Sequence, residues 1–126
     1  MSGGSNIADL APGLPRNFVR FCLLLLTAER PSHGYDYMDR LNNMGVPGVD
    51  PGGLYRTLRS MEQEGLLESR WETSDAGPAR RTYELSEDGM DWLHAWAAAH
   101  AETARIMSVF LDRYTDVVGA MSDASR

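Results

Sequence analysis

The last third of the chain carries a long stripe of mostly apolar residues at helical spacing, and no other feature restricts the fold as strongly. The positions alternate by three and four residues: Leu93, Trp96, His100, Thr103, Met107, Phe110, Tyr114 and Val117. We predict one helix that Ser86 caps and that ends at Val118, about 45 Å long at about 1.5 Å per residue. The rest of a 126-residue chain is too small to cover that length. The stripe therefore predicts a homodimer, with Leu93, Trp96, His100, Met107, Phe110 and Tyr114 in its interface.

Two shorter helices are predicted near the N-terminus, each with recognisable end signals. The first spans residues 16–29 and is stopped by Pro31, because the residue before a proline disfavours helical backbone. The second spans residues 33–44, with Ser32 as its N-cap and Gly45 in the place of the glycine that commonly ends a helix.

A third helix is predicted from Asp50 to Glu64. Asp50 is suited to cap it, and Pro51 fits its first position, where the missing N–H costs nothing. Gly65 is expected to end it. The core-facing stripe of this helix consists of Leu54, Leu58 and Met61.

A β-hairpin is predicted between this helix and the C-terminal one. Residues 66–71 and 80–85 have the composition of strands, and Tyr83 and Leu85 are expected to point inward. Residues 73–79 contain Asp, Gly and Pro, which predicts a long loop at the tip.

The order of these elements is that of a winged helix-turn-helix followed by one added helix. The predicted fold class is mainly α with a small β-hairpin. We expect a flexible N-terminal arm over residues 1–14, a winged-helix DNA-binding domain over 15–86, a dimerisation helix over 87–118 and a flexible tail over 119–126.

The net charge of −6 is unusual for a protein that binds nucleic acid, but its distribution is uneven. From Pro51 to Tyr83 five arginines stand against five acidic residues, whereas from Glu84 onward three arginines stand against eight. The acidic excess therefore lies mostly in the C-terminal third. Every basic residue is arginine, so any charged contact to phosphate uses a planar, bidentate donor.

The third helix is the predicted DNA-reading element. In a winged helix-turn-helix this helix enters the major groove with its N-terminal residues first, and a helix N-terminus attracts anions. Glycines at its start let the backbone approach a phosphate, and arginines on its outer face reach guanine edges. Arginines at the base of the hairpin would contact phosphates or a narrow minor groove. The predicted DNA-binding residues are Pro51, Gly52, Gly53, Arg56, Arg59, Ser60 and Gln63, with Arg80 and Arg81.

Several motifs resemble the PadR family of bacterial repressors, in the order that this family has them. They are His33-Gly34-Tyr35, Gly53-Leu54-Tyr55-Arg56-Thr57-Leu58, Met61-Glu62-Gln63-Glu64-Gly65-Leu66-Leu67, and Trp71 followed by Gly77-Pro78-Ala79-Arg80-Arg81-Thr82-Tyr83-Glu84-Leu85-Ser86-Glu87-Asp88-Gly89. The resemblance extends from about Leu14 to Tyr114 and is to the smaller subfamily, which has a single C-terminal helix. It implies a homodimer, adds Tyr55 to the residues that face DNA, and makes the loop around Gly77-Pro78 the tip of the wing.

A narrower resemblance connects the chain with PadR-like repressors that respond to poly-β-hydroxybutyrate. It rests on Leu14-Pro15-Arg16-Asn17-Phe18, Val49-Asp50, Trp71-Glu72-Thr73-Ser74 and Gly77-Pro78-Ala79. It implies a polyester-related ligand as one candidate effector.

Trp92 and Trp96 lie on adjacent turns of the C-terminal helix and have two interpretations. They either pack the dimer core or form an aromatic wall for a small apolar effector between subunits, as in multidrug-sensing members. Such members resemble this chain in having a tryptophan on this helix. Here, however, the position eleven after Gly89 is His100, and Trp96 comes one turn earlier.

No catalytic or metal site is predicted. The sequence contains no nucleophile–base set and no phosphate-binding loop followed by lysine, so we do not expect an enzyme or a cofactor. His33, His94 and His100 suggest metal sensing as a third hypothesis, but only Asp91 and His94 share a helical face.

The leading hypothesis is a dimeric, sequence-specific repressor that an effector releases from double-stranded operator DNA. The alternative is an interaction module that binds a protein or polymer surface on a winged-helix scaffold. The single cysteine, Cys22, fits a reducing cytoplasm, and the apolar run around it is too short to cross a membrane.

Overall fold

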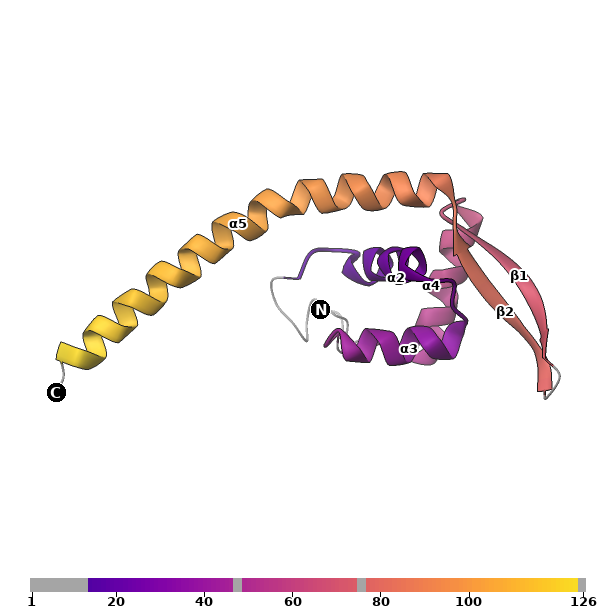
Figure 1. Cartoon of the computed structure of the whole chain (residues 1–126), viewed down its shortest axis with the longest axis horizontal. Helices are drawn as coiled ribbons and strands as arrows, with labels where there is room; N and C mark the ends of the chain where they lie inside the picture. The colour runs from indigo at the N-terminus through magenta and orange to yellow at the C-terminus, as the bar shows by residue number, and fades with distance from the viewer. Residues whose placement is uncertain (1–13, 47–48, 75–76, 125–126) are drawn as a thin grey trace, which may run out of the picture. The chain divides into compact units, whose positions relative to one another are not determined.

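The structure, a computed structural model, describes residues 14–46, 49–74 and 77–124 (Figure 1). Its elements in chain order are α2 (Phe18–Glu29), α3 (Gly34–Asn43), α4 (Pro51–Gln63), β1 (Leu67–Ser74), β2 (Gly77–Leu85) and α5 (Glu87–Ala124). The predicted fold class is confirmed: a mainly helical chain with a two-stranded antiparallel hairpin and a long C-terminal helix. Of the predicted N-terminal arm, only Leu14 lies within the described residues.

The chain divides into two units, residues 1–93 and residues 94–126. An apolar core joins the short helices and the hairpin within the first unit. α4 buries Leu54, Leu58 and Met61, which is the stripe that its sequence predicts. The other buried apolar side chains are Cys22, Leu23, Leu24, Leu26, Tyr37, Leu41, Val46, Leu66, Leu67 and Tyr83. Because all these elements share one core, side-chain packing determines where α4 lies relative to α2 and α3.

Both ends of α4 form as their residues predict. An Asp50 side-chain oxygen accepts a hydrogen bond from the Gly53 amide at 3.0 Å, and Pro51 occupies the first turn. Gly65 follows the C-cap with φ at +81°, a left-handed conformation that glycine adopts without a steric penalty. The helix that carries the predicted reading face is therefore defined largely by local sequence.

The start of α3 differs from the prediction. Ser32 is not the N-cap; His33 holds that position and makes no side-chain capping bond. Instead the Ser32 backbone pairs with Tyr83 of β2, with N···O distances of 3.4 and 2.9 Å. Local preference predicts Ser32 as a helix cap, but its backbone is hydrogen-bonded to Tyr83, a residue far away in the sequence. This pairing connects the helix-turn-helix to the hairpin.

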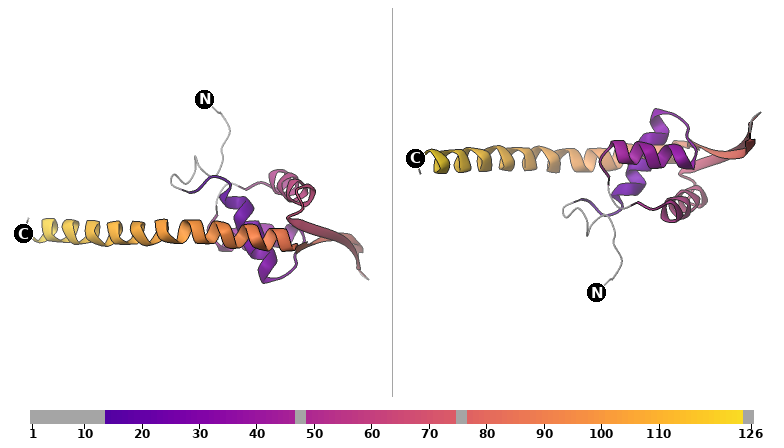
Figure 2. Two further views of the ribbon diagram at one scale, coloured as in Figure 1. Left: turned by 90° about the horizontal axis from the view of Figure 1, so that it is seen from above. Right: turned by 90° about the horizontal axis from the view of Figure 1, so that it is seen from below.

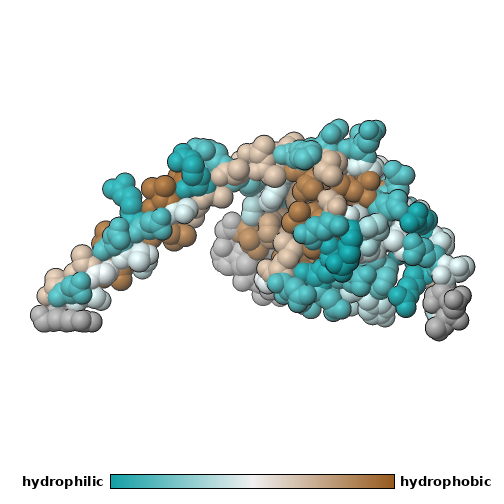
Figure 3. Space-filling model, in the orientation of Figure 1, coloured by the Kyte–Doolittle hydropathy of each residue, from teal (hydrophilic) through white to brown (hydrophobic). Residues whose placement is uncertain are grey.

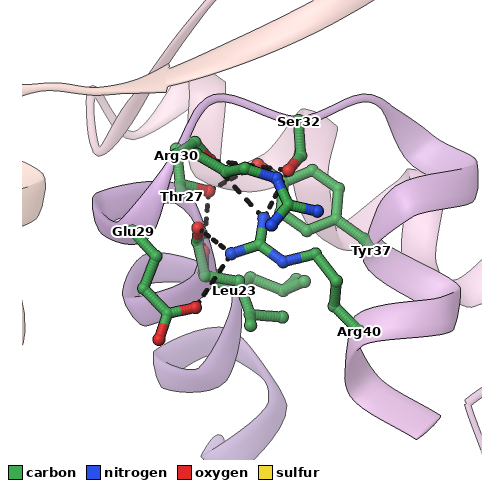
Figure 4. A network of polar contacts seen from close by, with 8 residues as sticks. Leu23, Thr27, Glu29, Arg30, Ser32, Tyr37 and Arg40 are labelled. Atoms are coloured by element: carbon green, nitrogen blue, oxygen red, sulfur yellow. Dashed lines mark hydrogen bonds and ion pairs between the residues drawn. The ribbon is translucent and has the colours of Figure 1, made fainter. Parts of the chain in front are cut away.

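A buried polar network holds α2 and α3 together (Figure 4). The Arg40 side chain is largely buried and donates to the Leu26 carbonyl at 2.6 Å, to the Glu29 carboxylate at 2.9 Å and to the Ser32 hydroxyl. The Leu26 carbonyl in the last turn of α2 also accepts from the Arg30 amide at 3.2 Å, so Arg40 adds a second hydrogen bond at this helix end. Burial of these groups is tolerated because they are hydrogen-bonded.

The same network includes a buried tyrosine. The Tyr37 and Thr27 hydroxyls are hydrogen-bonded to each other, and the Thr27 hydroxyl donates to the Leu23 carbonyl at 2.7 Å. Burial raises the pKa of Tyr37 to about 12, although the hydrogen bond with Thr27 opposes the shift.

The hairpin is longer than predicted. β1 extends to Ser74 and β2 begins at Gly77, so the long loop expected over residues 73–79 is wrong for the residues that the structure describes. The pairs Glu72 with Arg80 and Ser74 with Gly77 continue the ladder beyond the predicted strands. The two strands lie side by side in Figure 1, and Figure 2 shows the same hairpin from above and from below.

A glycine marks the start of α5. The Ser86 hydroxyl accepts a hydrogen bond from the Gly89 amide at 3.0 Å, which confirms Ser86 as the cap. A Cβ on Gly89 would overlap the Leu66 carbonyl oxygen and would lie 2.8 Å from a methyl carbon of Leu85. Gly89, which helix propensity alone marks as a weak residue, is there because the helix passes close to the preceding backbone.

In the second unit, α5 carries the predicted stripe as an exposed apolar surface. Its exposed apolar residues are Ile106, Met107, Val109, Phe110, Leu111, Tyr114, Val117, Val118 and Met121, and brown atoms gather there in Figure 3. The helix continues to Ala124, so the tail predicted from Gly119 is helical that far. One glycine costs a helix only about 1 kcal/mol, and Ala120 and Met121 favour continuation. No helix within the described residues is both long and apolar enough to span a membrane.

Candidate nucleic-acid interface

The outer face of α4 carries the predicted reading residues together. Tyr55, Arg56, Arg59 and Gln63 are exposed, and so is Gly52 at the start of the helix. Their one-sided exposure follows from the core stripe on the opposite face of the same helix. The predicted set on α4 therefore forms one surface.

Arg56 and Arg59 make no hydrogen bond or ion pair with any residue that the structure describes. This contrasts with Arg20, which pairs with Glu64 at 2.8 Å, and with Arg70, which pairs with Glu84 at the same distance. In a chain with more acidic than basic residues, unpaired arginines on one helix face leave a local positive charge for an anionic partner.

Of the two glycines at the N-terminus of α4, only Gly52 is exposed enough for a phosphate to approach its backbone closely. The amide of Gly53 already donates to Asp50, and Gly53 is half-buried. Gly52 is exposed, and a Cβ there would lie 3.3 Å from a guanidinium nitrogen of Arg56. The Arg56 side chain thus folds back over Gly52, so both groups face the same position at the helix N-terminus.

Ser60 differs from its exposed neighbours on α4. Its hydroxyl donates to the Glu64 carboxylate at 3.0 Å, and its side chain is half-buried. Hydrogen bonds from Arg20 and then from Ser60 lower the pKa of Glu64 below its ordinary value. Ser60 therefore has an intramolecular role in the last turn of α4.

Gly34 is part of the site although sequence reasoning assigned it no role. A Cβ on Gly34 would overlap the Tyr55 ring and its hydroxyl, so the tyrosine lies directly against the Gly34 backbone. The start of α3 thereby orients Tyr55 on the outer face of α4. The only sequence signal was the motif His33-Gly34-Tyr35, whose glycine has no obvious turn to make.

The two hairpin arginines have different surroundings. Arg81 donates to Ser69 at 2.9 Å and to both oxygens of Glu62 on α4 at 3.2 and 3.3 Å. Arg80 is exposed and donates from one guanidinium nitrogen to the His33 ring at 3.2 Å. Arg81 thus has a hydroxyl and a carboxylate partner, whereas Arg80 has only the His33 ring among the described residues.

A groove of about 730 Å³ separates α4 from the hairpin. Three aromatic side chains line it with large exposed fractions: Tyr35 at 78 %, Trp71 at 65 % and Tyr55 at 46 %. Arg59, Arg80 and Arg81 also line it. The groove joins the predicted reading helix to the predicted wing in one concave surface.

The two candidate effector tryptophans lie in different units of the chain. Trp92 is 57 % exposed and lines a pocket of about 170 Å³ with Phe21, Leu24 and Met61. Trp96 stacks on His100 with ring centroids 4.1 Å apart, and His100 contacts the Trp96 carbonyl oxygen at 3.0 Å. Among the described residues, no three metal-ligating side chains come together.

Comparison with known proteins identifies relatives of the greater part of the chain. Residues 23–95 match the transcriptional regulator PadR-like family. The transcriptional regulator Rv3488 of Mycobacterium tuberculosis is 37% identical over 90 residues, which are 71% of this chain and 82% of that protein.

Solved structures show the same fold. A PadR-like transcriptional regulator from Bacillus cereus has a TM-score of 0.69 at 24% identity, covering 76% of this chain and 93% of its own. A PadR family regulator from Eggerthella lenta has a TM-score of 0.68 at 23% identity, covering 83% and 91%. A conserved protein described as a potential transcriptional factor, TM0937, reaches 0.70 at 25% identity, covering 94% and 99%.

The family match covers more than half of the chain, and the motifs that carry it include the helix with the unpaired arginines. Family and fold together are those of a DNA-binding transcription regulator rather than an enzyme. The chain belongs to the transcriptional regulator PadR-like family.

Proposed function

We propose that the protein is a homodimeric repressor that binds a near-palindromic operator through a pair of α4 helices and leaves it when an effector binds. A two-fold dimer presents two identical reading helices, so its operator has matching half-sites one or more helical turns apart. The repressor acts on double-stranded DNA in the cytoplasm. With the wing adding contacts beside them, its DNA contacts are the exposed residues predicted on α4: Pro51, Gly52, Tyr55, Arg56, Arg59 and Gln63.

The unpaired guanidinium groups of Arg56 and Arg59 carry this proposal. Both extend from the outer face of α4, and neither has a partner within the described residues. An arginine pair to a guanine edge is worth about 1–3 kcal/mol of discrimination against a wrong base. Arginines that served only the fold would be expected to have carboxylate partners, as Arg81 has with Glu62.

The exposed stripe on α5 supports the homodimer. Met107, Phe110 and Tyr114 are each more than half exposed, in a run of apolar residues that continues to Met121. A soluble helix seldom leaves such a stripe in water. A second copy of α5 supplies a matching stripe, which is the usual way two long amphipathic helices bury their apolar faces.

Effector release is proposed to work through the dimer. An effector that changes the angle or spacing of the two α4 helices changes DNA affinity only if it binds the two dimer geometries differently. Trp92 and Trp96 remain the candidate contacts for a small apolar or polyester-related ligand, Trp92 beside the pocket next to Phe21. Trp96 stacks on His100, which also fits a purely structural role in the helix.

A gel-shift experiment tests the reading role. The probe is a duplex selected by the native protein from a random-sequence library. Arg56→Ala combined with Arg59→Ala is expected to weaken binding at least about 30-fold, since two contacts at about 1 kcal/mol or more are lost. Arg105→Ala removes one arginine charge from an exposed pair with Glu102, away from α4, and is the control.

Both variants are first shown to be folded by circular dichroism and dimeric by sedimentation. Specific binding that survives the double substitution would remove the two arginines from the reading role. Absence of any shift by the native chain, even at low salt, would favour the interaction-module alternative, because binding through arginine strengthens as salt falls.

A further inference from the structure

The groove between α4 and the hairpin is lined by large aromatic side chains that packing within the fold does not cover. Tyr35 and Trp71 are among the most exposed aromatic side chains described, yet they face a common hollow with Arg59. Large aromatic rings are rarely left this exposed on one surface unless a partner covers them. The surface combines apolar ring faces with cations, which complements a partner with apolar sugars and anionic phosphates.

The position of the groove identifies that partner. One wall is α4, which reads the major groove in the proposed function, and the other wall is the hairpin. In duplex DNA the sugar-phosphate strand lies between the major groove and the adjacent minor groove. If α4 enters one groove of the duplex and the wing lies over the next, the strand between them must lie in this hollow.

We propose that the groove seats one sugar-phosphate strand of the operator, that Tyr35 and Trp71 contact this strand, and that Arg81 is a positioning residue that fixes Trp71 and the wing against α4. The inference rests on the proposed function and adds roles for three residues to it. Tyr35 and Trp71 are new DNA contacts, and Arg81 leaves the set of predicted contacts.

Tyr35 and Trp71 have the chemistry for this contact. The Tyr35 hydroxyl and the Trp71 indole N–H both donate hydrogen bonds, and phosphate oxygens are strong acceptors. The flat indole also offers an apolar face to a deoxyribose ring. Arg59 and Arg80 line the same hollow and supply positive charge without a carboxylate partner among the described residues.

Arg81 is already engaged on the protein side. Its guanidinium donates to Ser69 on β1 and to Glu62 on α4, so it links the hairpin to the reading helix. Its central carbon also lies 5.7 Å from the Trp71 ring centroid, within the range of a cation–π contact. Arg81 thus holds Trp71 in place while Glu62 compensates much of its charge.

The first test measures whether DNA covers Trp71. The chain has three tryptophans, so a Trp92→Phe, Trp96→Phe variant retains Trp71 as its only one. Acrylamide is the quencher, because it is uncharged and DNA does not repel it. Adding the selected duplex is expected to lower the quenching constant of Trp71 at least about twofold, as a contacting strand would cover the ring. An unchanged constant in a complex that forms normally would overturn the proposal.

The second test separates contact from positioning by the salt dependence of affinity. Arg80→Ala is expected to lower the slope of log affinity against log salt by about one, as loss of a phosphate contact does. Arg81→Ala is expected to weaken binding severalfold with the slope unchanged. Arg81→Lys is expected to weaken it as well, because lysine keeps the charge but cannot hold Ser69 and Glu62 together.

Glu62→Gln gives opposite results for the two roles of Arg81. It removes the charge that holds Arg81, so a positioning role predicts weaker DNA binding. A contacting role predicts tighter binding, because the guanidinium would be freed for phosphate. Tighter binding by Glu62→Gln, or a reduced salt slope in Arg81→Ala, would overturn the assignment of Arg81.

A third measurement concerns Tyr35 alone. Tyr35→Phe removes one hydroxyl from an exposed side chain, and a hydrogen bond to a charged group predicts about a tenfold loss of affinity. Unchanged affinity would remove Tyr35 from the interface.

If the native chain shifts no duplex, the proposed function itself fails. If it shifts a duplex while Trp71 stays open to acrylamide, only the seating of the strand fails.

Discussion

The guanidinium of Arg40 donates to the Leu26 carbonyl oxygen at 2.6 Å, so a buried arginine of α3 closes the C-terminal end of α2. The same side chain reaches Ser32, whose backbone pairs with Tyr83 of β2. One arginine thereby connects the three elements that determine how α4 is presented, although it lies away from the reading face.

Arg40→Ala is expected to destabilise the fold by about 2–4 kcal/mol, because a largely buried side chain and its hydrogen bonds to the Leu26 carbonyl, the Glu29 carboxylate and the Ser32 hydroxyl are lost together. Urea unfolding followed by circular dichroism measures the change. Arg105→Ala, which breaks only an exposed pair with Glu102, is the control and should leave stability nearly unchanged, because solvent screens an exposed pair. A loss below about 1 kcal/mol for Arg40→Ala would contradict the buried role.

Gly34→Ala is expected to weaken DNA binding and to destabilise the fold by about 1–3 kcal/mol, since the new methyl group overlaps the Tyr55 ring. The decisive comparison is a double-mutant cycle with Tyr55→Ala. In the Tyr55→Ala background the cost of Gly34→Ala should fall by most of its value. Equal costs in both backgrounds would show that the two residues are not coupled.

Two glycines of α5 give a matched pair with opposite predictions. Gly89→Ala is expected to destabilise by about 2 kcal/mol or more, because its Cβ meets the backbone oxygen of Leu66. Gly119→Ala meets nothing within 4 Å and should stabilise the helix by about 0.5–1 kcal/mol. Thermal unfolding of the two variants provides the comparison. The same sign for both would contradict the close approach at Gly89.

Stability is expected to fall in alkali. Burial raises the pKa of the Cys22 thiol from 9.0 to about 11, and burial raises that of Tyr37 from 10.0 to about 12. For both acids the neutral form is favoured in the fold. Their contribution is therefore complete below the unfolded value and is lost as pH rises through the folded one. Cys22→Ala should flatten the decline between pH 9 and 11 in urea unfolding, leaving the later decline from Tyr37. A native chain equally stable across that range would refute the prediction.

The apolar stripe on α5 predicts a dimer that one charge disrupts. Phe110→Asp puts a carboxylate in the middle of the exposed stripe, and burying it unpaired costs several kcal/mol. Sedimentation is expected to show monomers for this variant and dimers for Arg105→Ala. Retained dimers in Phe110→Asp would move the interface away from this stripe.

Sequence reasoning was most successful where the physical cause is local. The Asp50 cap, Pro51 at the first position, and the left-handed glycines Gly45 and Gly65 all follow from backbone preferences within a few residues. The core stripe Leu54, Leu58 and Met61 follows from helical periodicity. Fold class and family were predictable for the same reason, since they rest on the order of such local signals.

The same reasoning was wrong or silent where the partner is far away along the chain. Ser32 was predicted to cap α3, but its backbone pairs with Tyr83 instead. Gly89 has a low helix propensity, and only its closeness to the Leu66 backbone explains why a glycine is there. Arg80 and Arg81 look equivalent in sequence, but only Arg81 has Ser69 and Glu62 within reach. The groove that contains Tyr35 and Trp71 gave no signal, because its two walls are separate elements.

The sequence by itself determined the order of elements, the ends of α4 and the apolar stripe of α5, because spacing and backbone preference act over a turn or a strand. Only the tertiary structure decided which arginines have a carboxylate partner. Whether Arg59 or Arg81 is available depends on which carboxylates the fold brings within hydrogen-bonding distance, and that depends on contacts between residues far apart in the chain.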